Sequence, residues 1–286
     1  MTITITTSNV NGIRAAKRKG IEQWAAKNTP DVWCMQEVRA PQNEIDPIFD
    51  EFGFEYATAG RIADQSGLDR MNEICRIKGR AGVGLLSALP VIDKRYGLSG
   101  LAEDVDSGRW IEADVKTPQG YTVTVVCVYV HAGNTDDPEK MKQKYRFLDT
   151  MLVRMGQLRD EAAHGGKQAV LCGDFNIAHT PLDIKNAKAN EKHAGFLPEE
   201  RAYVDKWLGE LEFVDVMRSL CGDIQGPYTW WSQRGRAFDN NVGWRIDYQF
   251  ATPELAETAR GFVIDKAPTY DLRWSDHAPL SITYDV

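Results

Sequence analysis

The sequence predicts an α/β protein in which two mixed β-sheets pack together with helices outside. Three observations support this fold class. Segments with the pattern of strands recur along all 286 residues. Several of them follow one another with only a turn between, and helical patterns separate only some of the others. A single parallel sheet would need a helix at nearly every crossover, so a mixed arrangement of two sheets fits better.

The strand segments are short runs rich in β-branched and aromatic residues, bounded by turn-forming residues. They are Thr2–Ser8, Val32–Gln36, Gly82–Ser87, Trp110–Val115, Thr122–Val130, Ala169–Cys172, Tyr228–Ser232, Arg245–Ala251, Phe262–Lys266 and Pro279–Tyr284. Apolar residues at helical spacing predict helices at Ile13–Asn28, Pro138–Ala163 and Pro198–Glu210. The stretch from about Ala57 to Gly82 has no clear period, and we expect a long loop or lid there.

The composition is that of a soluble globular protein. No internal repeat, low-complexity tract or Pro/Gly/Ser linker divides the chain, whose length suits one large domain or two ordinary ones. The first residues, Met1–Thr7, have no basic region followed by an apolar core. The longest apolar run, Val125–Val130, is far too short to cross a bilayer. We therefore expect a cytoplasmic protein with no membrane partner.

The cysteines favour buried free thiols over disulfides or a zinc site, because none of them shows CxxC spacing. They are Cys34, Cys75, Cys127, Cys172 and Cys221. The first, third and fourth of these lie in apolar, strand-like runs, where a thiol would be buried.

The formal net charge of −7 argues weakly against a non-specific nucleic-acid coat, although it permits a local basic patch. Basic residues cluster in Arg14–Lys19, Lys140–Arg146 and Lys185–Lys192. Each cluster taken alone is typical of the solvated face of a helix. An acidic protein that binds DNA must keep its carboxylates away from phosphates, unless a divalent cation lies between them.

Several of the predicted strands have a carboxylate or a carboxamide at one end. Three strands end in Asn9 and Asn11, Gln36 and Glu37, and Asp174 and Asn176, another carries Asp247, and the last begins at Asp276 followed by His277. A single residue of this kind is usually a turn former or a helix cap. Their recurrence argues for a site, because strand ends at one edge of a sheet converge. A converging set of carboxylates repels itself unless a cation or a histidinium neutralises it.

The residue types at these ends indicate which cation would bind. The candidate ligands are hard oxygen donors with no thiolate among them, namely Glu37, Asp174, Asp276, Asn9, Asn11 and Asn176. Such a set suits Mg²⁺ or Mn²⁺, and Mg²⁺ typically binds through one or two carboxylates plus phosphate oxygens. The expected chemistry is phosphoester hydrolysis, in which Asp174 orients or deprotonates a water. His277 would face the charged transition state, with Asp247 as its orienting partner.

The same residues form an ordered set of motifs that resembles the exonuclease III family of abasic-site endonucleases, members of the endonuclease/exonuclease/phosphatase superfamily. The motifs are Ser8-Asn9-Val10-Asn11-Gly12-Ile13-Arg14, Gln36-Glu37, Gly82-Val83-Gly84-Leu85-Leu86-Ser87, Gly173-Asp174-Phe175-Asn176, Asn241-Val242-Gly243-Trp244-Arg245-Ile246-Asp247-Tyr248 and Ser275-Asp276-His277-Ala278-Pro279. Any one motif is weak evidence, whereas the whole set in this order is strong. The match runs from residue 4 to residue 284.

The resemblance implies a four-layered α/β sandwich that forms a single catalytic domain over residues 1–286. It also implies Mg²⁺-dependent cleavage of duplex DNA on the 5′ side of an abasic site, often with 3′→5′ exonuclease and 3′-end repair activity. The expected partner is double-stranded DNA with abasic sites or blocked 3′ ends, and the expected state is a monomer.

Roles for individual residues follow from the same resemblance. Glu37 matches the principal metal ligand, and further ligands would come from Asn9, Asn11, Asp174, Asn176, Asp276 and His277. Asp174 matches the residue that activates the nucleophile, and Asn176 the one that positions it. Asp247 and His277 match an interacting pair at the scissile phosphate, and Tyr129 matches a tyrosine close to it.

Contacts to DNA are implied in the same way. Trp230 and Trp244 match the wall of a pocket that accepts a flipped-out abasic sugar, whereas Trp231 is more typical of core packing. Arg14, Arg273 and the run Lys140–Arg146 would contact phosphates without reading sequence.

Two positions depart from the family pattern. After Tyr129 the family usually continues with proline and an amide residue, but this chain continues Val130-His131-Ala132-Gly133, so that His131 or Asn134 would replace the amide. Arg39 stands where the family more often has lysine.

Two alternatives share the fold. The first is a phosphodiesterase or phosphatase acting on a lipid or inositol phosphate, which the motif Asn241–Tyr248 and the lack of an apolar membrane-binding loop disfavour. The second is a catalytically silent DNA-binding module. Such a module would have lost one of Glu37, Asp174 or His277, and all of these are present.

Overall fold

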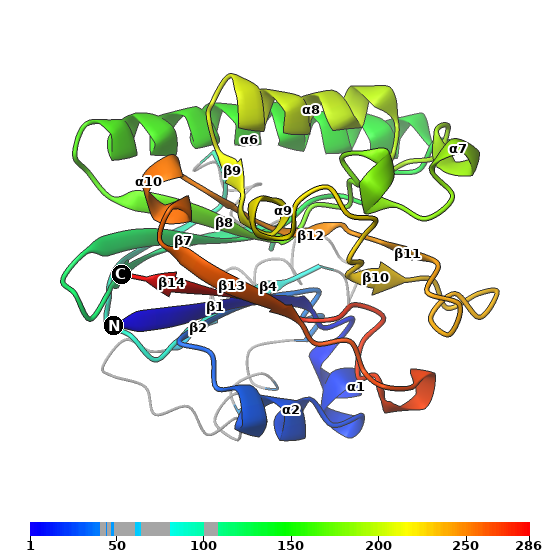
Figure 1. Ribbon diagram of the computed structural model, residues 1–286, viewed down its shortest axis with the longest axis horizontal. Coiled ribbons are helices and arrows are strands. Elements are labelled where there is room, and N and C mark those ends of the chain that lie inside the picture. The colour runs from blue at the N-terminus through cyan, green and yellow to red at the C-terminus, as the bar shows by residue number, and fades with distance from the viewer. Residues whose placement is uncertain (41–43, 45–46, 49–60, 64–80, 100–107) are drawn as a thin grey trace.

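Two large β-sheets pack face to face in the part of the chain that the structure describes, with helices on both outer faces (Figure 1). The structure is a computed structural model that describes residues 1–40, 44, 47–48, 61–63, 81–99 and 108–286. The layers run helices, sheet, sheet, helices. This arrangement confirms the predicted four-layered α/β sandwich of mixed sheets.

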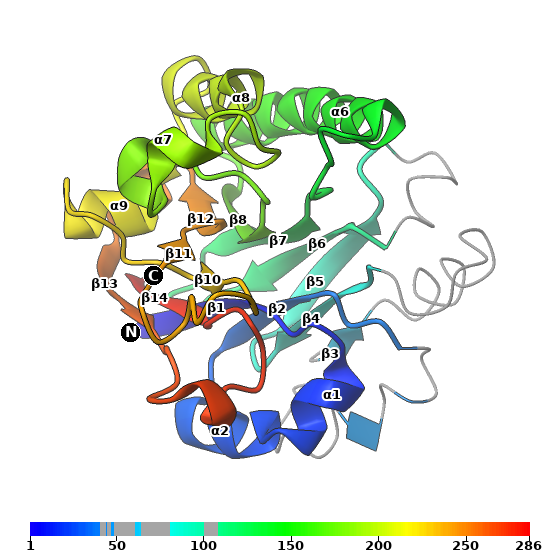
Figure 2. The same ribbon diagram turned by 90° about the vertical axis from the view of Figure 1, so that its right-hand side faces the viewer.

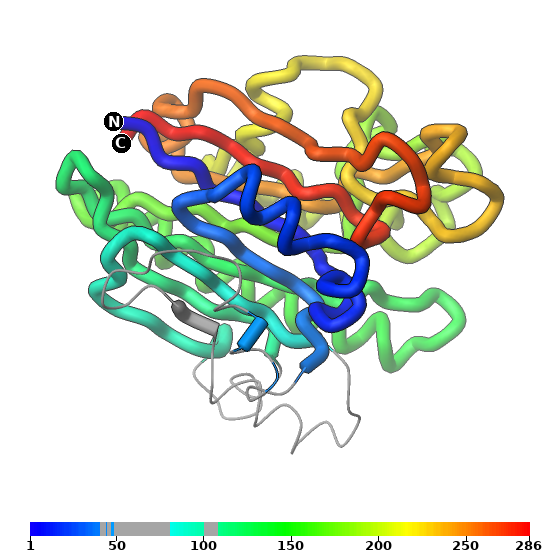
Figure 3. Tube along the Cα trace, turned by 90° about the horizontal axis from the view of Figure 1, so that it is seen from below, coloured from blue at the N-terminus to red at the C-terminus, as the bar shows by residue number. Residues whose placement is uncertain are grey.

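The first sheet contains both ends of the chain, which lie side by side (Figure 3). Its strands, in spatial order, are β13 (Ala259–Ile264), β14 (Leu280–Asp285), β1 (Thr2–Asn9), β2 (Val32–Gln36), β4 (Val83–Ser87) and β3 (Arg61–Ala63). Strand β1 pairs with β14 antiparallel and with β2 parallel. Helices α1 (Ile13–Arg18) and α2 (Ile21–Asn28) cover its outer face.

The second sheet is also mixed. Its strands, in spatial order, are β5 (Val91–Tyr96), β6 (Trp110–Lys116), β7 (Thr122–Tyr129), β8 (Gln168–Asp174), β12 (Asp247–Ala251) and β9 (Val214–Asp215). The long helices α6 (Pro138–Ala163) and α8 (Pro198–Gly209) cover its outer face.

Short elements complete the described fold. They are the helices α7 (Ala187–Asn190), α9 (Val216–Cys221) and α10 (Pro253–Ala256), the 3-10 turns η1 (Pro181–Asp183) and η2 (Tyr270–Leu272), and the small antiparallel pair β10 (Trp230–Trp231) and β11 (Gly243–Trp244). Figure 2 views the molecule from the side on which β10 and β11 lie. No helix among the described residues combines the length and the apolar character needed to span a membrane.

The main core lies between the sheets, where alternate residues of facing strands interdigitate. Ile5 of β1, Leu85 of β4 and Val125 of β7 are fully buried there. The cysteines at positions 34, 127 and 172 lie in the same core as free, buried thiols, as predicted. Cys221 is free and partly exposed, and Cys75 lies outside the described residues.

Most predicted elements are confirmed, with bounds shifted by up to three residues, as at β13, which was predicted at Phe262–Lys266 and spans Ala259–Ile264. The helix predicted over Ile13–Asn28 is wrong as a single helix, because it ends at Arg18 and a second helix starts at Ile21. Gly20 between them has φ +97°, a left-handed conformation that cannot continue a right-handed helix. The stretch from 57 to 82 lies mostly outside the described residues, although Arg61–Ala63 within it form β3.

Gly173 on β8 occupies a position where a side chain has no room. A Cβ there would lie 1.9 Å from the carbonyl oxygen of Val128 on the neighbouring strand β7. We expect Gly173→Ala to force the two strands apart and to lower the free energy of unfolding by about 1–3 kcal/mol, the usual cost of overpacking. Urea denaturation would measure this loss.

Gly156→Ala on α6 provides the control. A Cβ at Gly156 would meet only Leu211 Cδ2, at 3.8 Å, which is ordinary contact. Alanine also has the higher helix propensity, so stability should be unchanged or higher. Equal stabilities of wild type and Gly173→Ala would contradict the prediction.

Candidate active site

The register of the strands brings the polar strand ends together. Asp174 at the end of β8 is paired with Tyr129 of β7 on one side and with Asp247 of β12 on the other. In the first sheet, Asn9 of β1 is paired with Gln36 of β2, so that Glu37 follows directly beside it. The predicted convergence of strand ends is therefore confirmed.

Asn9 connects the two sheets at this point. Its amide Nδ2 donates to Glu37 Oε1 at 3.0 Å and to Asp174 Oδ2 at 2.9 Å. Its Oδ1 accepts from the backbone N–H of Asn11 at 3.0 Å. Asn9 is fully buried, and one side chain therefore fixes two carboxylates that come from different sheets.

Glu37 is held from several directions. Tyr129 donates its hydroxyl hydrogen to Glu37 Oε1 at 2.8 Å, and Arg39 forms an ion pair with Oε2. Arg39 Nη1 also donates to Asn11 Oδ1 at 2.9 Å. Burial, and next the negative charge of Asp174, raises the pKa of Tyr129 to about 12. The hydroxyl therefore keeps its proton at neutral pH and remains a hydrogen-bond donor.

Several of these residues have left-handed backbone conformations. Positive φ angles occur at Asn11 (46°), Glu37 (55°), Arg39 (53°) and Asn176 (51°). Such conformations cost about 1–3 kcal/mol each in residues other than glycine, and they persist where surrounding contacts enforce them. Their grouping at these strand ends is typical of a functional site.

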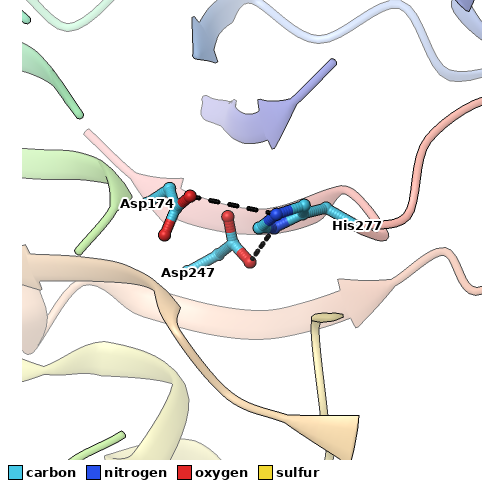
Figure 4. A group of neighbouring side chains, drawn as sticks. All are labelled: Asp174, Asp247 and His277. Atoms are coloured by element: carbon cyan, nitrogen blue, oxygen red, sulfur yellow. Dashed lines mark hydrogen bonds and ion pairs between the residues drawn. The ribbon is translucent and has the colours of Figure 1, made fainter. Parts of the chain in front are cut away.

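His277 lies between two aspartates (Figure 4). Its Nδ1 is 2.9 Å from Asp247 Oδ2, and its Nε2 is 3.8 Å from Asp174 Oδ2. Among the described residues, these three offer atoms within 4.8 Å of one another that could ligate a metal. The other oxygen of Asp247, Oδ1, is buried and accepts no hydrogen bond from the described residues.

The charges of this trio are coupled. Burial alone would lower the pKa of His277, but the carboxylates of Asp247 and Asp174 outweigh burial and raise it. Burial also raises the pKa of Asp174, with the Asp247 charge adding to the rise and the His277 charge opposing it. A protonated His277 has no lone pair for a metal, so this geometry favours a contact between His277 and an anion. The expectation that His277 is also a metal ligand stays a prediction.

Asp276, the residue before His277, is held by hydrogen bonds to both of its oxygens. Its Oδ1 accepts from Asn11 Nδ2 at 2.8 Å, and its Oδ2 accepts from Trp230 Nε1 at 3.2 Å. Burial opposes ionisation, but the charge of His277 and these two donors outweigh it and lower the pKa of Asp276. Asp276 is therefore ionised at neutral pH.

Asn176 bridges the ends of β7 and β8. Its Nδ2 donates to the carbonyl oxygen of Val130 at 3.0 Å and to Asp174 Oδ2 at 3.3 Å. Its backbone N–H donates to Asp174 Oδ1 at 2.9 Å. Both oxygens of Asp174 are therefore oriented by donors, as a proton acceptor in an active site requires.

These side chains surround a cleft of about 550 Å³. The described residues that line it are Asn11, Glu37, Arg39, Tyr129, Ala132, Gly133, Asp174, Asn176, Asn190, His193, Ala194, Gly195, Trp230, Trp244, Ile246, Asp276 and His277. Carboxylates outnumber positive charges among them. This donor set, rich in oxygen and short of positive charge, fits a hard divalent cation.

The predicted aromatic wall is present. Trp230 and Trp244 line the cleft, with their rings edge to face and 6.0 Å apart. Trp231 is buried against Phe238 and outside the cleft, as predicted for a core residue.

The structure does not bring the predicted phosphate contacts into the cleft. Arg14 is exposed on α1 and pairs with Glu44 at 2.9 Å. Arg273 is buried, with its guanidinium 3.9 Å from the centre of the Tyr270 ring. The expectation for Lys140–Arg146 is wrong for Lys144, which is fully buried and ion-paired.

Neither of the two residues expected to replace the family's amide residue, His131 and Asn134, lines the cleft. His131 packs its ring against Phe147, 5.7 Å away, and does not line the cleft. Burial, followed by the charges of Arg109 and Lys144, lowers the pKa of His131 to about 3, so it carries no charge at neutral pH. Asn134 is exposed and accepts from the backbone N–H of Asp136. Ala132 and Gly133 line the cleft instead.

Sequence reasoning gave no role to some of the lining residues. Asn190 and His193 come from the segment around α7, where only the basic run Lys185–Lys192 stood out. Arg39, which departs from the family pattern, contacts both Glu37 and Asn11. No pattern in the sequence marks Asn190 or His193, because loop packing alone places them at the cleft.

Comparisons with known proteins agree with this geometry. The pattern of the endonuclease/exonuclease/phosphatase family matches residues 6–277. An exodeoxyribonuclease of Bacillus subtilis is 29% identical over 279 residues, which cover 97% of this chain and 98% of that protein. A DNA-(apurinic or apyrimidinic site) endonuclease of Dictyostelium discoideum is 30% identical, over 97% of this chain and 69% of that protein.

Solved structures are similar over the same length. An AP endonuclease from Archaeoglobus fulgidus has a TM-score of 0.80 at 30% identity, covering 99% of this chain and 100% of that one. A 3′–5′ exonuclease from Neisseria meningitidis has a TM-score of 0.75 at 26% identity, covering 99% and 100%.

The Asp247 carboxylate should control the protonation of His277. In Asp247→Asn the largest of the charges that raise the pKa of His277 is lost while burial remains, so this pKa should fall, with the carboxylates of Asp174 and Asp276 still opposing the fall. NMR titration of the imidazole resonances would measure this, with His277→Gln assigning the signal.

Asp205→Asn is the matched control. Asp205 contacts His179 Nε2 at 2.7 Å on the protein surface, away from the site. It should leave the titration of His277 unchanged. An unaltered pKa of His277 in Asp247→Asn would refute the coupling.

Proposed function

The chain belongs to the endonuclease/exonuclease/phosphatase family as a hydrolase with a DNA-repair nuclease function, and we propose that it cleaves duplex DNA on the 5′ side of abasic sites. The observation that carries the proposal is the position of Asp174. Its carboxylate lies between Asn9, Asn176 and His277 at the base of an aromatic-walled cleft. Two of the similar proteins, an exodeoxyribonuclease and a 3′–5′ exonuclease, support a second activity on 3′ ends.

Asp174 is proposed to accept the proton of the attacking water. Asn176 would hold that water in line with the phosphorus atom, because its amide already lies beside Asp174 Oδ2. The imidazolium of His277, kept charged by Asp247, would contact a non-bridging phosphate oxygen and stabilise the charge that grows in the transition state. Tyr129 donates its single hydroxyl hydrogen to Glu37 here, and it would transfer this hydrogen bond to the same phosphate once Glu37 binds the cation.

The family is metal-dependent, and we propose Mg²⁺, with Mn²⁺ as a substitute, held by Glu37 together with Asp276, Asn11 and Asn9. When bound, the ion supplies Lewis-acid neutralisation of the phosphate and of the leaving oxygen. Glu37 and Asp276 are the carboxylates of this set, and both line the cleft together with His277. The cation and the His277 imidazolium would therefore neutralise different parts of the same phosphate group.

The cleft suits an abasic sugar. Trp230, Trp244 and Ile246 form its apolar wall, and its volume of about 550 Å³ suits a small residue extruded from the duplex. Extrusion costs less at an abasic site because there is no base to unstack.

We also propose that the enzyme acts as a cytoplasmic monomer, a proposal that rests on the sequence alone.

Nicking should require a divalent cation. We expect the protein to cut a duplex with a single tetrahydrofuran abasic analogue in Mg²⁺ or Mn²⁺, and to lose this activity in excess EDTA, because the carboxylates of the cleft would repel the phosphate. Gel assays on abasic duplex, intact blunt duplex and an inositol phosphate would measure substrate choice. Full activity in EDTA, or preference for the inositol phosphate, would refute the proposal.

Asp174→Asn should separate chemistry from binding. The amide keeps the shape of the side chain but cannot accept the proton, so turnover should fall by about 10²–10⁴-fold. The dissociation constant for abasic duplex should change little, as measured by fluorescence anisotropy in Ca²⁺. A loss of affinity as large as the loss of turnover would assign Asp174 a structural role instead.

A further inference from the structure

A buried ion pair lies directly behind the cleft wall. Lys144 of α6 and Glu200 of α8 are both 0% exposed, and Nζ is 2.6 Å from Oε1. Buried ion pairs are a poor source of stability, because the cost of removing both charges from water rivals their attraction. The other contacts of this pair indicate what it does.

Lys144 connects two loops of the cleft. Its ammonium group donates to the carbonyl oxygens of Ala132 at 3.2 Å and Asn176 at 2.9 Å, in addition to Glu200. These contacts use all the hydrogens that an ammonium group can donate. Ala132 follows β7 and Asn176 follows β8, and both residues line the cleft.

Glu200 holds a third loop with its other oxygen. Oε2 accepts the backbone N–H groups of Gly195 at 2.6 Å and Leu197 at 3.0 Å. Gly195 lies in the cleft wall, where an added Cβ would be 3.0 Å from Trp244 Cζ3 and 3.1 Å from the carbonyl oxygen of Asn176. A shift of this turn would therefore displace Trp244 or Asn176.

Asn176 connects the buried ion pair to Asp174. Its backbone is left-handed, with φ 51°, a conformation that neighbouring contacts must enforce. Lys144 binds the carbonyl oxygen of Asn176, while the side chain of Asn176 binds Asp174. Without Lys144, the carbonyl oxygen of Asn176 would be left buried beside an unpaired Glu200, and relaxation would move the side chain as well.

We propose that Lys144 and Glu200 are positioning residues that hold Asn176, Ala132 and Gly195 in the reactive arrangement of the cleft. Neither side chain touches the cleft itself, so both act through the loops they bind. The effect on turnover rests on the proposed function, whereas the effect on the loops does not.

Arg154→Met is a matched control for Lys144→Met. Both cations lie on α6, separated by about 15 Å along the helix axis, and each pairs with a buried glutamate. Arg154 binds Glu112 at the outer face of the sheet, far from the lining residues.

Two measurements test the proposal. Hydrogen exchange by mass spectrometry should show faster exchange in segments 130–134, 176–179 and 193–197 of Lys144→Met, and unchanged exchange there in Arg154→Met. On abasic duplex in Mg²⁺, Lys144→Met should lower kcat by about 10–100-fold with KM within about threefold, since small misplacements of reacting groups cost this much. Arg154→Met should retain the wild-type kcat.

Should Lys144→Met fail to fold, Lys144→Met/Glu200→Leu removes both charges and restores an apolar contact between the helices. It should fold and still show the low kcat. A folded variant with unchanged exchange in these segments, or with kcat within twofold of wild type, would overturn the proposal. If the wild-type protein does not nick abasic duplex, the proposed function fails, and exchange alone then decides whether the pair positions the loops.

Discussion

The pairing of β8 with β12 sets the constraint on which the rest of the site depends. Their register places Asp174 directly opposite Asp247, and both are buried. Two buried carboxylates paired on adjacent strands repel each other unless a cation lies between them. Among the described residues, His277, which precedes β14 in the first sheet, forms an ion pair with both carboxylates and supplies this cation. The electrostatic requirement of one sheet is therefore met by the other, and this makes the face-to-face packing necessary for the site as well as for the core.

Hydrogen bonds between the strand ends and several strained backbone conformations hold these charges in place. Ser275 donates its hydroxyl hydrogen to the carbonyl oxygen of Asn9 at 2.6 Å, which ties the segment before His277 to the end of β1. Asn9 then binds carboxylates of both sheets, and the left-handed residues at the strand ends turn their side chains inward. The left-handed conformations cost conformational free energy, and the hydrogen bonds and the sheets around them supply the stability that maintains them. The rigidity of the site thus comes from the core, while its reactivity comes from strained strand ends.

The sequence predicted those parts of the molecule that local patterns encode. Strand alternation and the acidic strand ends indicated two mixed sheets and a convergent cluster, and the cluster of Glu37, Asp174, Asp247 and His277 is confirmed. Properties that depend on tertiary packing were missed. Lys144 belongs to a basic run that looks solvated, yet α8 buries it, and Arg273 stacks on Tyr270 instead of facing the cleft. A run of basic residues shows only the composition of a segment. Whether one of them is buried depends on which helix packs over the segment, and the local sequence does not encode this packing.

The acidic character of the chain also follows from the site. Under the proposed function, a protein of net charge −7 binds a polyanion through a cleft in which carboxylates outnumber positive charges among the described lining residues. A phosphate alone would be repelled there, and a divalent cation alone would be attracted. Because binding free energies are reciprocal, each then increases the affinity of the cleft for the other. The net negative charge of the chain opposes non-specific adhesion to undamaged DNA. A chain with a large basic surplus would bind DNA at many points, whereas an acidic chain with one cation-binding cleft favours a phosphate that enters the cleft.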